Sequence, residues 1–517
     1  MIPTTGRPGI DRHAVRHPGH AGDDVVHDRT VVVVGGGIAG LAAATALAER
    51  GVHVTLLEAG PRLGGRVQSW PVDGQRTMSR GFHAFFRQYY NLRALLRRAD
   101  PDLERLVAIN DYPLQRPDGT RDSFTGLPTT PPINVLEFVR RSPAFSARAL
   151  AKVDKIAALE MLQVHFPGTY DRYDGESAGA FLDRLRFPEK ARDLALEVFA
   201  RSFFADPYQF AAGELVAMFH TYFVGSAEGL LFDVPDDDYD STLWAPLGAH
   251  LTRLGVDVRT DTAVTDIEAG PDAIIAHTDH GDHAADAVTI ATDPRVARRL
   301  CATIPGEDHE VVKWRERVGA TRNAPPFVVV RLWLDRPVDA DRPAFLGTAG
   351  YGPLDNVSLL ERFELGAAQW AAEHTGSVVE LHAYACAGDL MENPHRRDQL
   401  VDELLQELHR AYPETRPANI LHREVLVQDD CTLVTPEPWS RRPGVETPWP
   451  TVTLAGDWVR TDLPVALMER AATTGFLAAN HLLAQWGGRG HDLWTVPMHG
   501  LLTAQRLTPP MLRRAKP

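Results

Sequence analysis

Cysteine is scarce in this chain, and its scarcity excludes two kinds of architecture. Only Cys301, Cys386 and Cys431 occur in 517 residues, and no two of them have the Cys-x-x-Cys spacing of a zinc or redox motif. A disulfide framework requires several cysteines at regular spacings, and a structural zinc site requires clustered thiolates or imidazoles. We therefore predict buried free thiols in a reducing compartment.

The chain also has no excess of positive charge, and its first residues do not show the pattern expected of a secretory leader. Asp and Glu (68) outnumber Lys and Arg (54), so the net charge is −14, which argues against binding nucleic acid. The first thirty residues hold arginines, prolines and glycines but no apolar signal-peptide core. These features predict a cytoplasmic protein whose residues 1–29 form a disordered tail.

Two groups of histidines remain as candidates for a metal site. Three histidines lie between residues 13 and 20, in the predicted tail, where a preorganised site is not expected. Three more lie within 277–283, around an Asp-His-Gly-Asp stretch that is typical of a turn between strands over 273–277 and 284–291. A hairpin explains the second group better, so we predict no metal.

What the sequence does contain is a strand, a glycine turn, a helix and an acidic residue in the order that binds a dinucleotide. The valines at 31–34 predict a buried strand, and Gly35 permits the tight turn after it. Gly37 lets the backbone approach a pyrophosphate at a helix N-terminus, and Gly40 lets that helix pack on the sheet. Glu58, 18 residues after Gly40, is placed to accept hydrogen bonds from an adenosine ribose. The uncharged run over 31–48 is thereby explained without a membrane span.

A second motif begins at the same acidic residue. The string Glu58-Ala59-Gly60-Pro61-Arg62-Leu63-Gly64-Gly65-Arg66 resembles the extended FAD fingerprint of the amine oxidase and carotenoid desaturase flavoproteins. Arg62 can lie over the adenosine side, Arg66 can neutralise phosphate charge, and Gly64 and Gly65 keep the backbone close to the cofactor. A nicotinamide enzyme has no need of this second glycine pair. We therefore expect noncovalent FAD, with Ala59 also in contact with it.

A later segment returns to the cofactor. Residues 451–457 predict a buried strand that ends in Gly456 and Asp457, and residues 467–479 predict a helix with small residues on one face. Asp457 can accept hydrogen bonds from ribityl or phosphate groups. The helix N-terminus near Met468 can place N–H groups against the flavin pyrimidine, where negative charge develops on reduction. Val264, in a strand predicted nearby, is a further expected cofactor contact.

The block from Gly81 to Leu92 makes the resemblance narrower. It is similar to the G-L-H-x-F-F-G-x-Y-x-N segment of phytoene and ζ-carotene desaturases, and the likeness runs from about residue 31 to 479. The resemblance places Gly81, Phe82 and His83 beside the cofactor, with His83 as a structural hydrogen-bonding residue. Within this family, residues 80–92, 111–114 and 456–459 look most like the carotenoid φ-ring synthases of the isorenieratene type. At three positions the chain differs from the residue usual in these desaturases: Phe82 replaces a leucine, Arg87 a glycine, and Trp458 a tyrosine. These differences favour a branch of the family with its own substrate.

The resemblance implies an FAD-dependent oxidoreductase that desaturates and aromatises the β-ionone rings of β-carotene, with a 1,2-methyl shift. Three alternatives stay open: an acyclic phytoene or ζ-carotene desaturase, another flavin amine oxidase, and a non-enzymatic isoprenoid carrier on the same fold. Glu228 and Asp233, which the resemblance places near the substrate channel, are candidate catalytic carboxylates, weighed against the alternative of solvated loop acids. The following aromatic residues are candidates for an apolar tunnel or for plain core: Phe82, Phe85, Phe86, Phe203, Phe204, Phe219, Tyr222 and Phe223.

We predict an α/β fold with an FAD-binding Rossmann-like domain of the amine oxidase/phytoene desaturase type, interleaved with an α+β substrate domain. Segments 30–95, 236–310 and 415–490 are assigned to the first domain, 96–235 and 311–414 to the second, and 491–517 to a C-terminal tail. Because carotenoids reside in membranes, peripheral association with the inner face of the cell membrane is expected, through a candidate helix over 146–162. A quinone or oxygen is expected to accept the electrons.

Overall fold

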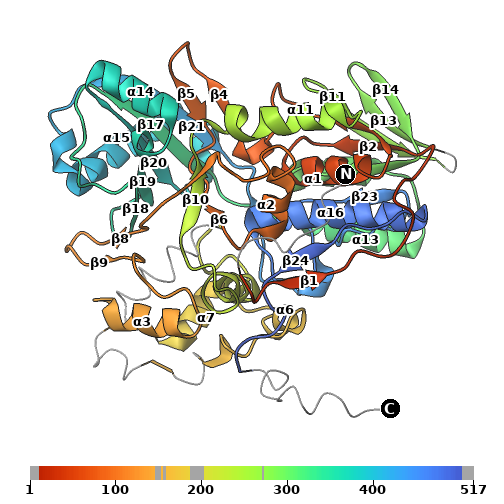
Figure 1. Cartoon of the computed structure of the whole chain (residues 1–517), viewed down its shortest axis with the longest axis horizontal. Helices are drawn as coiled ribbons and strands as arrows, with labels where there is room; N and C mark the ends of the chain where they lie inside the picture. The colour runs from red at the N-terminus through yellow and green to blue at the C-terminus, as the bar shows by residue number, and fades with distance from the viewer. Residues whose placement is uncertain (1–10, 146–152, 155–158, 187–202, 271–272, 503–517) are drawn as a thin grey trace.

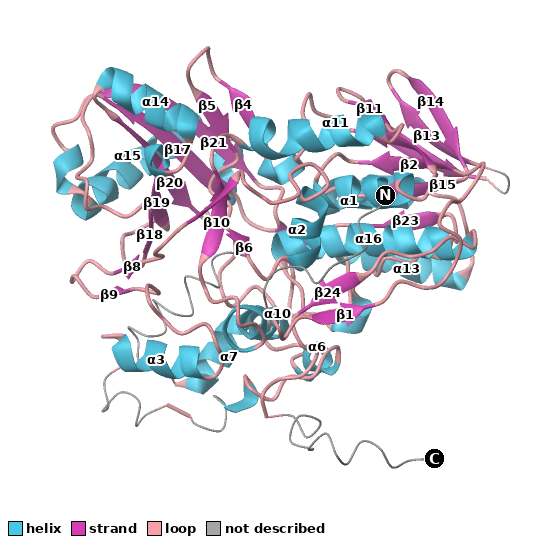
Figure 2. Ribbon diagram, in the orientation of Figure 1, coloured by secondary structure: helices cyan, strands magenta, loops and turns pink. Residues whose placement is uncertain are grey.

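The computed structural model describes residues 11–145, 153–154, 159–186, 203–270 and 273–502. Figure 1 shows a parallel sheet on the right, a mainly antiparallel sheet on the left and a group of helices below both. The same arrangement in Figure 2 shows that helices flank both sheets. None of the helices in the described part of the chain combines the length and apolarity needed to cross a bilayer.

Five parallel strands form the sheet that carries the glycine motif. Their order is β11 (Asp257–Arg259), β3 (His53–Leu57), β2 (Thr30–Val34), β15 (Ala287–Ile290) and β23 (Val452–Leu454). The four valines of β2 are buried because this central strand is covered on both faces. Strands from all three segments assigned to the nucleotide-binding domain therefore meet in one sheet.

The alternation of side chains along β2 decides what covers each face of the sheet. Val31 and Val33 face the core shared with α1 (Ile38–Ala48) and α16 (Leu467–Gln485). A Cβ on Gly475 of α16 would lie 2.2 Å from the Ala39 carbonyl oxygen, so only glycine lets these helices approach so closely. In Figure 1 they lie next to each other, red and blue.

Val32 and Val34 face the second core, under α12 (Pro294–Thr303), α13 (His309–Ala320) and an antiparallel meander. The meander consists of β12 (Val264–Ala269), β13 (Ile274–Thr278) and β14 (Gly281–Ala285). The hairpin predicted around the second histidine group is confirmed, since β13 pairs with β14 and residues 279–280 form its turn.

The second large sheet has seven strands. Their order is β21 (Ile420–Gln428), β17 (Phe327–Leu334), β20 (Ser377–Ala383), β19 (Asn356–Leu359), β18 (Phe345–Thr348), β8 (Leu114–Gln115) and β9 (Arg121–Asp122). α14 (Leu365–His374) packs on the face that carries Trp333 and Val378, while α15 (Pro394–Ala411) packs on the face that carries Leu332 and Val379. The domain boundary proposed at residue 415 is wrong for β21, because this strand pairs with β17 and not with the nucleotide sheet.

Shorter elements lie between the two sheets and below them (Figure 1). They include α3 (Ile133–Arg141), α6 (Gly168–Arg172), α7 (Ala178–Leu185), α10 (Ala212–Phe219), a π-helical turn (His220–Val224) and a small sheet ordered β6 (Phe85–Phe86), β10 (Phe232–Pro235), β7 (Leu106–Ala108). Two further helices are α2 (Tyr90–Leu96) and α11 (Ala245–Arg253), and a second π-helical turn spans Asp240–Trp244. Short strands form two pairs, β4 (Ser69–Pro71) with β5 (Thr77–Ser79) and β16 (Arg322–Asn323) with β22 (Thr432–Leu433). The 3₁₀ turns lie at Gly65–Val67, Leu360–Arg362, Gly388–Met391, Pro413–Thr415 and Trp439–Arg441. The predicted membrane helix over 146–162 falls mainly on residues outside the described ones.

The prediction of a disordered tail over 1–29 is wrong for residues 11–29. β1 (Val15–His17) pairs with β24 (Leu493–Thr495), which belongs to the segment predicted as a C-terminal tail. The Asp11 carboxylate is buried and accepts hydrogen bonds from the Tyr90 and Ser226 hydroxyls, each at 2.9 Å. Residues 15–17 and 493–495 thus pair across almost the whole length of the sequence, which no local pattern indicates.

Candidate functional site

A cavity of about 470 Å³ separates the nucleotide sheet from the seven-stranded sheet, and most of the predicted cofactor residues line it. Those in its lining are Gly35, Gly37, Glu58, Ala59, Gly64, Gly65, Arg66, Phe82, His83, Val264, Gly456, Asp457 and Met468. Gly40, Arg62 and Gly81 lie outside the lining.

The glycine turn after β2 brings backbone groups to the cavity wall. Gly35 adopts a φ of +107°, and a Cβ there would lie 2.7 Å from the Ala291 carbonyl oxygen. Gly37 caps the N-terminus of α1, whose first N–H groups have no partner within the helix. A helix N-terminus presented by a glycine turn fits a pyrophosphate.

Glu58 connects the turn to the second motif. Its carboxylate accepts hydrogen bonds from the Gly36 N–H at 2.6 Å and from the Gly60 N–H at 2.8 Å. Burial raises the pKa of Glu58, while these two bonds oppose the rise. The Gly64 N–H donates to the Gly36 carbonyl at 2.8 Å, so the two glycine motifs lie against each other. The predicted strand–turn–helix–acid unit therefore forms a continuous wall.

Arg66 and Asp457 bring the two ends of the site together. Arg66 Nη2 lies 2.5 Å from Asp457 Oδ1, and the same oxygen accepts a bond from the Thr432 hydroxyl at 2.9 Å. Burial opposes the charge of Arg66, but Asp457 raises the pKa of its guanidinium, so it stays a cation at the cavity. This cation fits the phosphate role predicted for Arg66.

The three residues outside the lining have other surroundings. A Cβ on Gly40 would lie 1.9 Å from the Gly35 carbonyl oxygen, which agrees with its predicted packing role. Arg62 pairs with Asp240, with Nη1 3.1 Å from Oδ2, rather than facing the cavity. A Cβ on Gly81 would lie 2.6 Å from the His382 ring, so this glycine makes room for a neighbouring strand.

The first turn of α16 also faces the cavity. Leu467, Met468 and Ala471 line it. Glu469 points the other way and accepts bonds from the backbone N–H groups of Asn91 and Leu92, both at 2.9 Å. The N-terminus of α16 is therefore held by α2, with its positive end toward the cavity, an orientation that suits a ligand on which negative charge develops.

The wall opposite the nucleotide motif is aromatic. Phe82 packs against Phe345 with ring centroids 4.4 Å apart, and Phe86 stacks on Tyr222 at the same distance. The members of the predicted tunnel set that line the cavity are Phe82, Phe86, Phe204 and Tyr222; Phe85, Phe203, Phe219 and Phe223 are not in the lining. This end of the cavity is suited to an apolar ligand.

His83 has its ring nitrogen Nδ1 2.8 Å from the Gly81 carbonyl oxygen, to which it must donate. Burial lowers the pKa of His83 to about 4, so its imidazole is neutral. The Tyr239 hydroxyl donates to the same carbonyl at 2.9 Å and accepts from the backbone N–H of His83 at 3.0 Å. The ring is therefore held in place by the loop around it.

Glu228 and Asp233 do not line the cavity, so their positions do not support the catalytic role predicted for them. Asp233 is buried and pairs with Arg93 at 2.7 Å and with Arg87 at 3.4 Å. Glu228 is buried and accepts a bond from the Asp11 N–H at 2.9 Å. They are also not solvated loop acids: both hold segments of the chain together.

The sequence analysis missed the contribution of the seven-stranded sheet to the site. Thr348, Asp355, Asn356 and Tyr384 line the cavity, and they come from the segment 311–414, which was assigned to the substrate domain without any site residue. One signal was present: apolar and polar residues alternate along 379–384, at the end of an otherwise apolar strand. In a strand buried on both faces, polar side chains are costly unless they are hydrogen-bonded, so such alternation indicates a buried polar network. Among the described residues, no group of three or more His, Cys, Asp or Glu is arranged to hold a metal ion.

Comparison with known proteins agrees with this geometry. The family model of flavin-containing amine oxidoreductases matches residues 38–483. The chain is 54% identical to the carotenoid phi-ring synthase of Streptomyces griseus over 96% of both chains. It is 29% identical to the carotenoid phi-ring synthase of Chlorobaculum tepidum over 92% of this chain and 91% of the other.

A solved structure shares the fold at low sequence identity. Cyclohexylamine oxidase from Brevibacterium oxydans superposes with a TM-score of 0.63 at 14% identity, over 89% of this chain and 99% of that chain. This likeness concerns the fold alone. Together with the glycine cradle, the Arg66 cation and the oriented helix α16, the matches show that the chain belongs to the flavin-containing amine oxidoreductases, in the group of the carotenoid φ-ring synthases, and is a flavin-dependent oxidoreductase.

Proposed function

We propose that this enzyme binds FAD noncovalently and converts the β-ionone rings of β-carotene into aromatic φ-rings of the isorenieratene type. The observation that carries the proposal is a single cavity that joins a dinucleotide cradle, with Gly35 and Glu58, to an aromatic wall, with Phe82 and Phe345. The 54% identity to a carotenoid phi-ring synthase supports the choice of substrate.

The substrate itself dictates the order of bond changes. A β-ionone ring carries two methyl groups on one quaternary carbon, so it cannot become aromatic until one methyl moves. When bound, the flavin supplies the capacity to accept hydride. Loss of hydride beside the quaternary carbon leaves a ring cation, a 1,2-methyl shift makes it tertiary, and proton loss installs a double bond. A second hydride and proton loss completes the ring, and no methyl donor is needed.

The protein contributes binding, orientation and exclusion of water. The aromatic side chains of the cavity wall surround an apolar ring without offering it a nucleophile. The Cys431 thiol also lines the cavity, and burial raises its pKa to about 12, so it stays protonated and weakly nucleophilic. This supports noncovalent binding of FAD. A quinone or oxygen would then take the electrons.

Expression in cells that accumulate β-carotene tests the proposed reaction. Chromatography of the pigments is expected to show β-carotene replaced by products with aromatic rings, and the purified protein is expected to release FAD on heating. A strain that accumulates phytoene or ζ-carotene serves as the parallel host for the acyclic alternative. Flavin-loaded protein that leaves β-carotene unchanged would refute the reaction, and protein without flavin would favour the carrier.

We also propose that the enzyme docks on the inner face of the cell membrane through α3. Ile133 and Leu136 lie on this helix with 55% and 66% of their surfaces exposed. Arg140 and Arg141 follow them, and both pair with Glu137, so this end of the helix keeps one net positive charge. In Figure 1, α3 lies at the lower edge of the molecule, far from α14. Exposed apolar side chains beside basic ones are typical of a helix at a lipid surface.

Flotation with liposomes that contain anionic lipid tests this docking. The double variant Ile133→Glu/Leu136→Glu is expected to stay at the bottom of the gradient while the unaltered enzyme floats. Leu365→Glu is the matched control, because Leu365 on α14 is 60% exposed and lies away from α3. Equal flotation of the double variant and the unaltered enzyme would refute docking through α3.

A further inference from the structure

A row of three polar side chains leads from the interior of the seven-stranded sheet to the cavity. Glu380, His382 and Tyr384 are two residues apart along and just past β20, so they lie on one face of the strand. Glu380 Oε1 lies 2.8 Å from His382 Nε2, and His382 Nδ1 lies 2.8 Å from the Tyr384 hydroxyl. Glu380 has no exposed surface, whereas Tyr384 lines the cavity.

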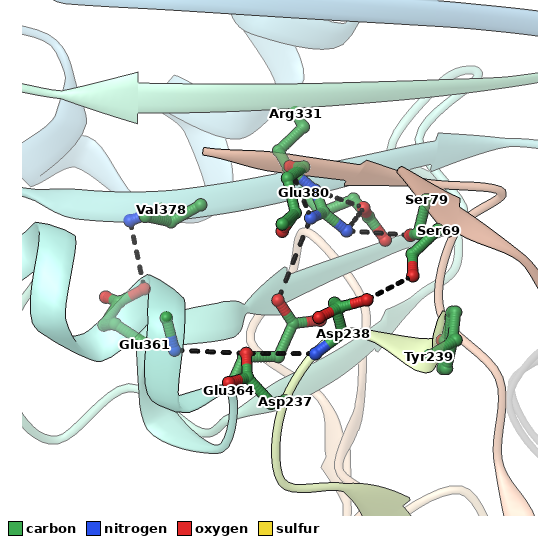
Figure 3. A network of polar contacts seen from close by, with 12 residues as sticks. Ser69, Ser79, Asp237, Asp238, Tyr239, Arg331, Glu361, Glu364, Val378 and Glu380 are labelled. Atoms are coloured by element: carbon green, nitrogen blue, oxygen red, sulfur yellow. Dashed lines mark hydrogen bonds and ion pairs between the residues drawn. The ribbon is translucent and has the colours of Figure 1, made fainter. Parts of the chain in front are cut away.

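The buried end of the row carries a fixed negative charge. Arg331 on the neighbouring strand donates to Glu380 Oε2 from Nη2 at 2.7 Å and from Nε at 2.9 Å (Figure 3). Burial favours the neutral acid, but Arg331 and His382 hold the pKa of Glu380 at about 2. Glu364 lies on the other side of Arg331, with Oε2 3.8 Å from Nη1. Arg331 thus occupies Oε2 of the Glu380 carboxylate, and Oε1 is left to accept a hydrogen bond from His382.

The hydrogen bonds give the row a direction. The ionised Glu380 can only accept, so His382 Nε2 carries a hydrogen and donates to it. The Phe82 N–H also approaches Nε2 at 3.3 Å, but the shorter, charge-assisted bond to Glu380 decides the tautomer. In the neutral imidazole, Nδ1 then accepts from the Tyr384 hydroxyl. The Asn356 amide donates to the same phenol oxygen at 3.0 Å and holds it in place.

We propose that Tyr384, His382 and Glu380 form a proton relay that removes the proton from the substrate cation, an inference that rests on the proposed function. The C–H bond beside the cationic carbon breaks, and its electron pair becomes the new C=C bond. The proton passes to the Tyr384 oxygen while the phenol proton passes to His382 Nδ1. The resulting imidazolium is paired with the Glu380 carboxylate, and release of one proton to solvent restores the relay.

A phenol is a weak base, but two features make it sufficient here. A C–H bond next to a carbocation is strongly acidic, and Tyr384 gives up its own proton in the same step, so no charged phenol forms. Tyr89 and Tyr222, which also line the cavity, bond instead to each other, with their hydroxyl oxygens 2.6 Å apart. Tyr384 is a candidate catalytic residue, whereas His382 and Glu380 act through it as positioning residues.

The test uses the flavin-loaded, full-length enzyme with β-carotene in detergent micelles. Tyr384→Phe and His382→Gln are expected to lower the rate of desaturation at least tenfold and to abolish the solvent deuterium isotope effect on it. Gln can keep hydrogen bonds to both neighbours but cannot hold an extra proton. Flavin absorbance and quenching of flavin fluorescence by β-carotene are expected to stay as in the unaltered enzyme. Tyr412→Phe, which removes a buried hydroxyl outside the cavity, is the control and should change nothing.

The outcomes separate the relay from the proposed function. If the unaltered enzyme converts β-carotene and Tyr384→Phe retains its rate and isotope effect, the relay is refuted and the function stands. Loss of flavin or of carotenoid quenching in both variants would also refute the relay, because it would assign the row a binding role. If the unaltered enzyme leaves β-carotene untouched, the proposed function itself fails.

Discussion

Arg66 and Asp457 stand 391 positions apart in the chain, yet their charged groups meet at the cavity with Nη2 2.5 Å from Oδ1. The pair joins the motif that follows β3 to the segment that follows β23. Because the site contains both residues, neither end of the chain can form it alone.

Replacing Arg66 by Gln is expected to weaken FAD binding by at least tenfold. The change removes the cation at the cavity wall and leaves the Asp457 carboxylate, 12% exposed in the pair, without its ionic partner. Equilibrium dialysis of the apoprotein against FAD measures the effect. Arg105→Gln, which breaks a partly exposed pair with Asp236 away from the cavity, serves as the control. Equal affinity in all three proteins would contradict the role of Arg66.

Gly40→Ala is expected to destabilise the protein by about 3 kcal/mol and to abolish flavin retention. The new Cβ would lie 1.9 Å from the Gly35 carbonyl oxygen, a backbone atom that cannot move without distorting the turn. Gly74→Ala is the matched control, since a Cβ there meets nothing within 4 Å. Thermal unfolding and flavin absorbance measure both effects, and a fully flavin-loaded Gly40→Ala protein would disprove the account.

Glu469→Leu is expected to destabilise the protein by about 2 kcal/mol. The two side-chain oxygens of Glu469 accept bonds from the N–H groups of Asn91 and Leu92 in the first turn of α2, and a leucine would leave these buried donors without a partner. Burial raises the pKa of Glu469 to about 8, so the side chain is largely a neutral acid at pH 7 and the loss does not depend on its charge. Chemical denaturation followed by tryptophan fluorescence gives the size of the loss. Glu310→Gln, on an exposed side chain, should change stability by less than about 0.5 kcal/mol. Similar stability of the two variants would show that α2 does not depend on Glu469.

Glu364→Gln is expected to reduce the loss of stability between pH 5 and pH 8. Burial raises the pKa of Glu364 to about 7, although Arg331 opposes the rise. The native state therefore holds a proton that the unfolded state has already released, so ionisation destabilises the fold as pH rises from about 4.5 to about 7. The effect is on the order of 3 kcal/mol. Urea midpoints at the two pH values measure it, and equal shifts in the two proteins would contradict it.

The local patterns of the chain picked out residues that the structure brings to the wall of one cavity. The valine strand, the glycine turn and Glu58 lie within thirty residues, and their roles follow from the backbone conformation and spacing that a dinucleotide imposes. The residues after β23 could be assigned for the same reason, once the first motif had identified the kind of ligand.

Residues whose surroundings come from distant segments could not be assigned in this way. Glu228 and Asp233 are hydrophilic in type and lie in an acidic stretch, but their partners Asp11 and Arg93 come from remote parts of the chain. The same holds for residues 11–29, which are ordered by a strand at 493–495.

The sequence by itself indicated a nucleotide-binding cradle of the flavoprotein kind, because the strand, glycine turn, helix and acidic residue that build it lie close together in the chain. Only the tertiary structure decided what faces the cradle, because the seven-stranded sheet brings Tyr384 and its buried partners to the cavity from across the chain. A carboxylate or phenol acquires its chemistry from burial and neighbours, and these are properties of the fold and not of any segment.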